Sequence, residues 1–306
     1  MIPSPLLRRA AVAAVAALAI SWPEMLSTRT QAQSREGFFR TSPSGSYLAA
    51  RHAGDQRGDP STNELLGRTF LAVLANGEVD EGVKLAERVL QVDKNDSIAR
   101  LVLGVRALKQ KQYSVARREL FQSVRGPITD LAATLLSAWT MANPTEAKRA
   151  TDSIDKLAGA DWYAIFKELH AALILDLAGQ KKEAAKRFER SYKLDPTTLR
   201  VVQSYGSFLS RQGNNADALK VFAAFEEALP RHPLIVEATN ELKAGKKLPL
   251  MVDTPQAGAA EVLYRLGAAL GRRGGRISGS STCSFRSISR PRIRSPCFRS
   301  ATSTRR

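Results

Sequence analysis

Small and apolar residues recur through the middle of this chain at a constant spacing of 34 residues. A glycine or alanine occupies the first set of positions: Gly104, Ala138, Ala172 and Gly206. Alanine occupies a second set: Ala116, Ala150, Ala184 and Ala218. Large apolar residues occupy a third set: Leu120, Ile154, Phe188 and Phe222. A fixed period of this length is typical of repeat proteins, in which each unit buries its apolar face only by stacking on its neighbours.

A unit of this length can hold two helices of about 14 residues with their turns. The segment from Leu175 to Pro196 contains every part of one unit. Gly179 can end the first helix in a left-handed conformation. Ala184 and Phe188 stand four residues apart on one face of the second helix. Pro196 cannot continue a helix, so it forces the next turn. The small residues should let the two helices approach closely, while the large ones fill the space between them.

This spacing, the small residues and the closing Asp195-Pro196 together make the chain resemble the tetratricopeptide repeat (TPR) family. The resemblance implies an all-α fold, a right-handed superhelical solenoid of antiparallel helix pairs. We predict about five repeats in residues 63–239, a spacer loop at 240–258 and the first helix of a truncated sixth repeat at 259–275. The repeats should begin near Asn63, Ser97, Leu131, Ile165 and Leu199. A generic helical bundle with coincidental spacing is the alternative.

Two repeats depart from the pattern. The first has Gly82 and Ala86 at the small and large positions of its second helix. The third lacks the turn glycine that Gly77, Gly179 and Gly213 provide elsewhere. We expect Asn143-Pro144-Thr145 to make the turn there instead.

The N-terminal segment has the pattern of a secretory signal peptide, predicted to span residues 1–32. Arg8 and Arg9 precede an apolar run of eleven residues, Ala10–Ile20. That run has the length of a signal peptide core and is too short to cross a bilayer. No cysteine follows it, so we expect no lipid anchor. Export to a bacterial periplasm is the prediction, and an uncleaved amphipathic anchor is the alternative. Residues 33–62 are predicted to be a flexible lead segment with a remnant helix.

The C-terminal segment, residues 276–306, differs in composition from the rest. It contains eight arginines, many serines and no acidic residue, which predicts disorder. The change falls inside a predicted repeat, as a reading-frame shift in the gene would produce. A genuine basic tail that binds nucleic acid or an anionic membrane surface is the alternative. The tail carries eight of the net seventeen positive charges and residues 1–32 carry two more, so about +7 remains for the body. There, basic and acidic residues alternate on helix faces, as on an ordinary solvated surface.

Residues typical of catalysis or metal binding are few. The three histidines, His52, His170 and His232, have no cysteine or carboxylate pair at ligand spacing. Both cysteines, Cys283 and Cys297, lie in the C-terminal segment. No phosphate-binding loop, nucleophile elbow or metalloprotease motif is present. We therefore predict that the protein is not an enzyme and uses no cofactor, metal or small-molecule substrate.

A binding surface is the remaining functional prediction. The TPR resemblance implies that first helices line a concave face which holds a protein or peptide partner, while export argues against nucleic acid. Aromatic and arginine residues are common anchors of interfaces. Trp139 could equally be a core residue. The predicted partner-binding residues are Val105, Lys109, Trp139, Asn143, Leu173, Asp176, Arg200, Gln203, Ser207 and Arg211.

Overall fold

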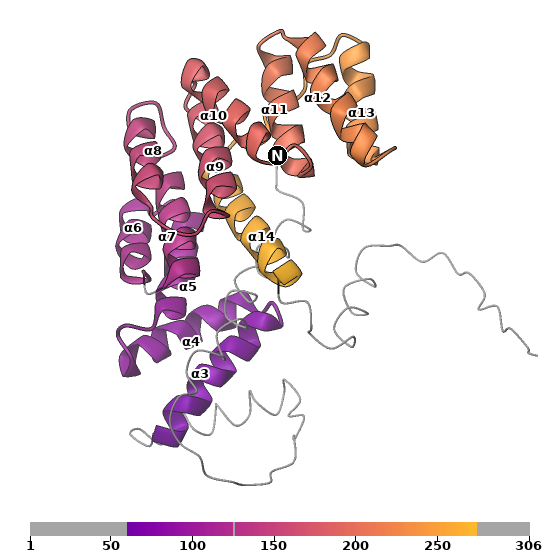
Figure 1. Ribbon diagram of the computed structural model, residues 1–306. Coiled ribbons are helices and arrows are strands. Elements are labelled where there is room, and N and C mark those ends of the chain that lie inside the picture. The colour runs from indigo at the N-terminus through magenta and orange to yellow at the C-terminus, as the bar shows by residue number, and fades with distance from the viewer. Residues whose placement is uncertain (1–59, 125, 274–306) are drawn as a thin grey trace, which may run out of the picture.

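The computed structural model describes residues 60–124 and 126–273, and this part of the chain contains twelve helices and no strand (Figure 1). The predicted signal peptide, the C-terminal tail and nearly all of the lead segment lie outside the described residues. The helices are α3 (Pro60–Ala75), α4 (Val79–Val92), α5 (Ser97–Lys109), α6 (Tyr113–Gln122), α7 (Pro127–Trp139), α8 (Ala147–Lys156), α9 (Tyr163–Leu177), α10 (Lys181–Leu194), α11 (Leu199–Arg211), α12 (Asn215–Ala228), α13 (Pro233–Lys243) and α14 (Pro255–Arg273).

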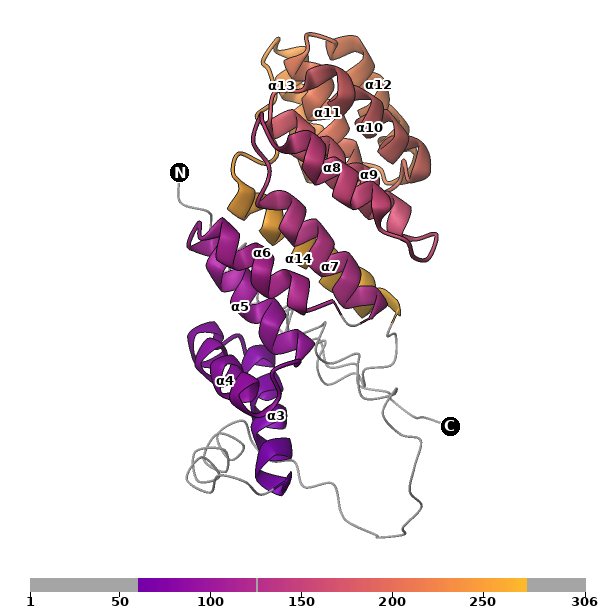
Figure 2. The same cartoon turned by 90° about the vertical axis from the view of Figure 1, so that its left-hand side faces the viewer.

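Consecutive helices form five pairs, α3/α4, α5/α6, α7/α8, α9/α10 and α11/α12. Each second helix also packs on the first helix of the next pair, so the pairs stack into a continuous array (Figures 1 and 2). The first helices begin at Pro60, Ser97, Pro127, Tyr163 and Leu199, within a few residues of the predicted repeat starts. The fold class predicted from the sequence, an all-α solenoid of antiparallel helix pairs, is confirmed.

The small residues of the repeat bring the two helices of a pair together. A Cβ atom added to Gly206 would overlap the Phe222 ring, and one added to Gly104 would overlap the Leu120 side chain. Ala116, Ala150, Ala184 and Ala218 have no solvent exposure. The 34-residue spacing is therefore a record of one interhelical contact repeated along the array.

The turn between the helices of a pair is closed by a residue with positive φ. Gly77, Gly179 and Gly213 have φ angles of +83°, +77° and +87°. In the second repeat the equivalent position is Lys111, which has a φ of +61°. Each of these residues donates its backbone N–H to a carbonyl in the last turn of the first helix. In the third repeat, as predicted, Asn143 makes the turn: its Oδ1 accepts the backbone N–H groups of Thr145 and Glu146.

Lys111 thus takes a conformation that costs an L-residue roughly 1–2 kcal/mol. Lys111→Gly should raise the free energy of unfolding by about 1 kcal/mol, because glycine adopts this conformation without steric cost. The reciprocal change, Gly179→Lys, should lower it by a similar amount, since no atom lies within 4 Å of an added Cβ there. Urea unfolding followed by circular dichroism measures both. Shifts of the same sign in the two variants would contradict this account.

The first helices form the inner layer of the array. Besides their contacts within pairs, α5 packs on α7, α7 on α9 and α9 on α11. We call the surface formed by α5, α7, α9 and α11 the inner face.

The structure corrects the prediction for the C-terminal part of the array. Pro233 lies 34 residues after Leu199, and α13 starts there as the next first helix. The predicted spacer loop at 240–258 is shorter, because α13 extends to Lys243 and α14 begins at Pro255. The helix predicted to begin a truncated sixth repeat is α14. Instead of continuing the array, α14 packs on α7 and also on α5 and α9.

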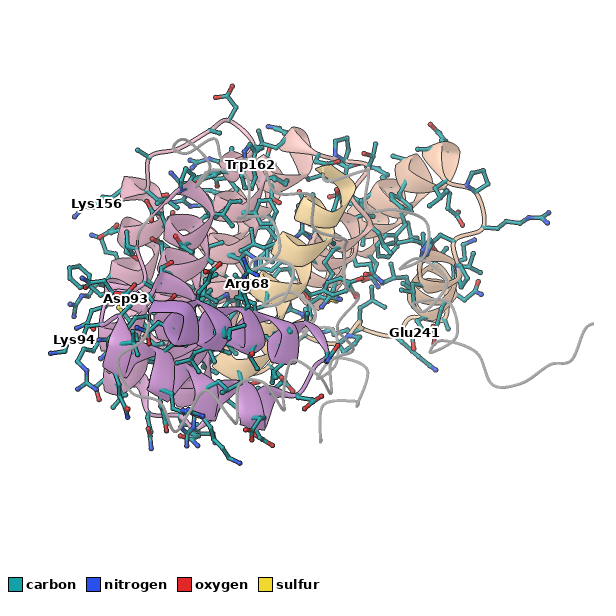
Figure 3. The ribbon with its side chains drawn as sticks, turned by 90° about the horizontal axis from the view of Figure 1, so that it is seen from below. Arg68, Asp93, Lys94, Lys156, Trp162 and Glu241 are labelled. Carbon is teal, nitrogen blue, oxygen red and sulfur yellow. The ribbon has the colours of Figure 1, made fainter. Side chains whose placement is uncertain are left out.

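Seen from below, α14 lies between the helices of the first repeats and the helices α11–α13 (Figure 3). Four apolar side chains of α14 are buried there, Ala259, Val262, Leu263 and Leu266. Their spacing of three and four residues places them on one face of the helix. The C-terminal helix therefore covers the inner face.

Candidate partner-binding groove

Trp139 lies at the centre of the contact between the inner face and α14. It ends α7, has no solvent exposure, and donates its Nε1–H to Nδ1 of His170 on α9 at 3.2 Å. The two rings meet edge to face, with centroids 6.1 Å apart. Gly258 of α14 stands over the indole, and a Cβ atom there would overlap the ring. Trp139 thus fixes how closely a helix can approach the inner face.

A bidentate ion pair joins the inner face to α14. Arg200 of α11 donates from Nε and Nη2 to the two carboxylate oxygens of Glu261, each at 2.9 Å. Only 4% of the Glu261 side chain is exposed, against 32% for Arg200. Paired, fork-like hydrogen bonds of this kind are directional as well as strong. This pair therefore sets the position of α14 along the groove.

Polar contacts also hold the two ends of the segment that enters the groove. Gln256 donates from Nε2 to the carbonyl of Leu108 at 3.1 Å and to the Tyr113 hydroxyl at 3.2 Å. Residues 244–254, which connect α13 to α14, are attached to α11. The backbone N–H of Leu248 donates to Ser210 Oγ at 3.0 Å, and Ser207 donates its hydroxyl to the carbonyl of Pro249.

Three of the predicted partner-binding residues, Trp139, Arg200 and Ser207, contact the segment 244–273. Asp176 and Arg211 form a second bidentate ion pair between α9 and α11, with distances of 3.0 and 2.5 Å. The structure does not bring the remaining predicted residues into one cluster. Leu173 is buried in the core, Val105 and Gln203 are half-buried, Lys109 is exposed at the end of α5, and Asn143 holds the turn after α7.

The prediction for Trp139 needs a correction, because this side chain is buried under α14 and offers no exposed contact surface. Sequence analysis missed the residues that α14 supplies: Gln256, Gly258, Glu261 and Arg265. The Arg265 guanidinium lies over the Phe166 ring, 5.6 Å from its centroid. The available signal was the amphipathic spacing of α14 together with the regular position of Pro233, which already accounts for the next first helix.

His170 is fully buried beneath α14. Burial lowers the pKa of His170 well below its ordinary value, and the positive charges of Arg265 and Arg200 lower it further. Its Nδ1 already accepts the Trp139 hydrogen bond, and its Nε2 has no hydrogen-bond partner in the described part of the chain. The folded protein therefore holds a neutral imidazole between α7, α9, α11 and α14.

This burial predicts a loss of stability in mild acid. The unfolded chain binds a proton at His170 below about pH 6.5, whereas the folded chain does not. The free energy of unfolding should be full above that pH and fall below it, with a slope approaching about 1.4 kcal/mol per pH unit. Urea unfolding between pH 7.5 and pH 5 measures the slope. His170→Gln keeps an acceptor for Trp139 without a titrating group, so it should flatten the slope; an unchanged slope would assign the effect elsewhere.

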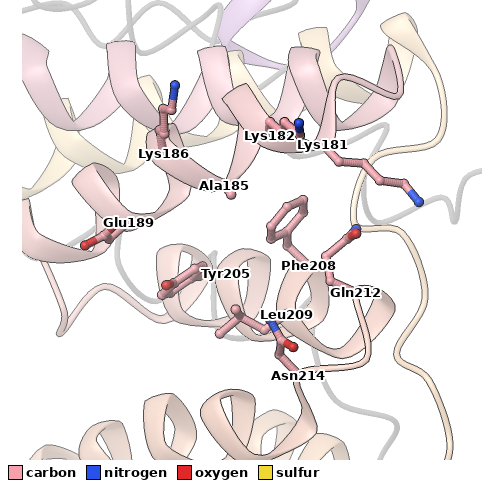
Figure 4. A pocket seen from close by; sticks show the side chains of 10 residues that line it. All are labelled: Lys181, Lys182, Ala185, Lys186, Glu189, Tyr205, Phe208, Leu209, Gln212 and Asn214. Atoms are coloured by element: carbon pink, nitrogen blue, oxygen red, sulfur yellow. The ribbon is translucent and has the colours of Figure 1, made fainter.

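A separate open cleft lies between α10 and α11 (Figure 4). Its volume is about 340 Å³. Lys181, Lys182 and Lys186 of α10 line one side, and Tyr205 and Phe208 of α11 line the other. Lys186 forms an ion pair with Glu183 at 3.0 Å. The cleft marks the boundary between the main core and a smaller core cluster formed by α11, α12 and α13.

Two further searches cover residues 60–124 and 126–273. No group of three or more histidine, cysteine or acidic side chains in this part could hold a metal ion. Within the same ranges, no helix has both the length and the apolar character that crossing a bilayer requires.

Comparison with known proteins gives one structural similarity to report. No protein-family model matches the chain, and no curated protein is significantly similar to it. The crystal structure of YrrB, described as a TPR protein with an unusual peptide-binding site, aligns with 64% of this chain and 99% of that chain, at 12% identity and a TM-score of 0.43. A similarity of this degree says nothing of what the present chain binds.

Proposed function

We propose that this protein is a non-catalytic helical-repeat scaffold that binds a protein or peptide partner through its inner face. One observation carries the proposal: the inner face holds a helix through a close apolar contact at Trp139 and a directional ion pair at Arg200. Buried aromatic and arginine side chains of this kind supply most of the binding energy in protein interfaces. Polypeptide in helical form is therefore the ligand to which this surface is shaped.

A photo-crosslinking amino acid tests this proposal in the organism that makes the protein. The reactive residue replaces Lys109, which is exposed at the end of α5, and in a control it replaces Phe121 of the second helix α6, which is 82% exposed. We expect a discrete protein adduct from position 109 and none of the same mass from position 121. Identical adducts from both positions, or none from position 109, would refute the proposal.

We further propose that the scaffold works in the bacterial periplasm. The basic residues and short apolar run of segment 1–32 support this location. Mass spectrometry of the mature protein and fractionation of cells measure it directly. A full-length N-terminus in the cytoplasmic fraction would exclude periplasmic export. The alternative, a basic tail that binds nucleic acid or anionic lipid, concerns residues outside the described part and stays a prediction.

A further inference from the structure

The helix α14 occupies the inner face as a ligand would. It is separated from the array by the connection 244–254, and it reaches back over a sequence distance of 148 residues to contact Leu108. Its buried face carries Ala259, Val262, Leu263 and Leu266, while Tyr264 on another side is 51% exposed. An amphipathic helix laid on an apolar groove, with anchors three and four residues apart, is a recurring mode of peptide recognition.

The contacts of α14 define which helices the inner face accepts. The position over Trp139 must be glycine, because even a Cβ atom overlaps the indole. The position three residues later must be a carboxylate, because it meets the guanidinium of Arg200 in a region where only 4% of the Glu261 side chain is exposed. Apolar residues must follow on the same face, as Val262 and Leu266 do.

The charges of the groove make the carboxylate selective. Arg211 is already neutralised by Asp176, whereas Arg200 has Glu261 of α14 as its ion-pair partner. The buried His170 beneath them stays neutral and offers no compensating negative charge. A helix with a neutral or basic residue at this position would leave the Arg200 guanidinium facing an apolar or like-charged surface, which is costly where water is excluded.

We propose that the inner face binds, in trans, an amphipathic helix of a partner protein that has a glycine followed three residues later by a carboxylate, and that α14 is the intramolecular stand-in for this helix. The proposal rests on the proposed function and deepens it by naming the partner's chemistry. Because α14 is tethered, its effective concentration at the groove is on the order of millimolar. A partner helix binds only by displacing it, so the free groove is the high-affinity state.

A synthetic peptide of residues 250–269, labelled with fluorescein, tests the proposal on the full-length chain by fluorescence anisotropy. In the chain variant Glu261→Arg, the internal helix faces Arg200 with a like charge and should leave the groove. This variant should bind the wild-type peptide on the order of tenfold or more tightly than the wild-type chain does, because the internal competitor is gone. Circular dichroism confirms that the repeats remain folded; should this variant unfold, Gly258→Leu displaces α14 at Trp139 instead.

A charge exchange provides the matched control. The chain variant Arg200→Glu should bind a peptide carrying Glu261→Arg and reject the wild-type peptide, while the Glu261→Arg chain shows the opposite preference. A peptide carrying Gly258→Leu should bind neither chain. Equal binding of all peptides to all chains would overturn the proposal, and so would uptake that requires a dimer in light scattering, because the occupant would then be a second copy of the chain. If no peptide binds while crosslinking at position 109 still yields a partner, this inference fails and the proposed function stands.

Discussion

Replacing Trp139 with alanine should lower the free energy of unfolding by about 3–5 kcal/mol, the range for truncating a fully buried large aromatic side chain. Trp139 has no solvent exposure, and its ring is enclosed by α7, His170 of α9 and Gly258 of α14. The truncation leaves a cavity at the point where three helices meet, and it removes the donor for His170 Nδ1. The loss should therefore reach α14 as well as the helix that carries the tryptophan.

Urea unfolding of the full-length chain measures the loss, and hydrogen exchange shows where it acts. We expect faster amide exchange along α14 in Trp139→Ala. Phe121→Ala is the matched control, since this aromatic side chain is 82% exposed and its truncation should change stability by no more than about 0.5 kcal/mol. Similar losses from the two variants, or unchanged exchange in α14, would contradict the central position of Trp139.

The array of helix pairs could be predicted from the sequence because its contacts are local and repeated. Gly206 meets Phe222, and Gly104 meets Leu120, within a single unit of the repeat. A contact made sixteen residues away recurs with the same spacing in each unit, so the period reveals it. The same holds for the turns, where Gly179 and Gly213 adopt positive φ angles at equivalent positions.

The position of α14 could not be predicted from the period, because its contacts occur once. Gln256 reaches Leu108 and Glu261 reaches Arg200, and no other unit of the array repeats either contact. In the sequence, Glu261 resembles the many acidic residues of solvated helix faces. Its burial depends on where the helix docks, and docking is decided by the close contact between Gly258 and Trp139. The prediction therefore found residues of the inner face but missed what covers it.

The ion pair between Arg200 and Glu261 should be worth far more than the other pairs of opposite charge on this protein. Arg200→Ala leaves the Glu261 carboxylate without its partner in a site where only 4% of its side chain is exposed. Removing one member of a fully buried pair costs about 3–5 kcal/mol. Because 32% of the Arg200 side chain is exposed, we expect a loss of unfolding free energy near the lower end of that range.

The pair between Arg106 and Glu87 is the matched control. It also joins two helices, with a distance of 2.7 Å, but its side chains are 43% and 54% exposed. Exposed pairs contribute about 0–1 kcal/mol, so Arg106→Ala should have little effect. Urea unfolding at pH 7.5 compares the two variants. The double variant Arg200→Leu with Glu261→Leu should recover much of the stability that Arg200→Ala loses, because it removes the uncompensated charge. Equal losses from Arg200→Ala and Arg106→Ala would show that solvent reaches Glu261, and that α14 is not held in the groove by its carboxylate.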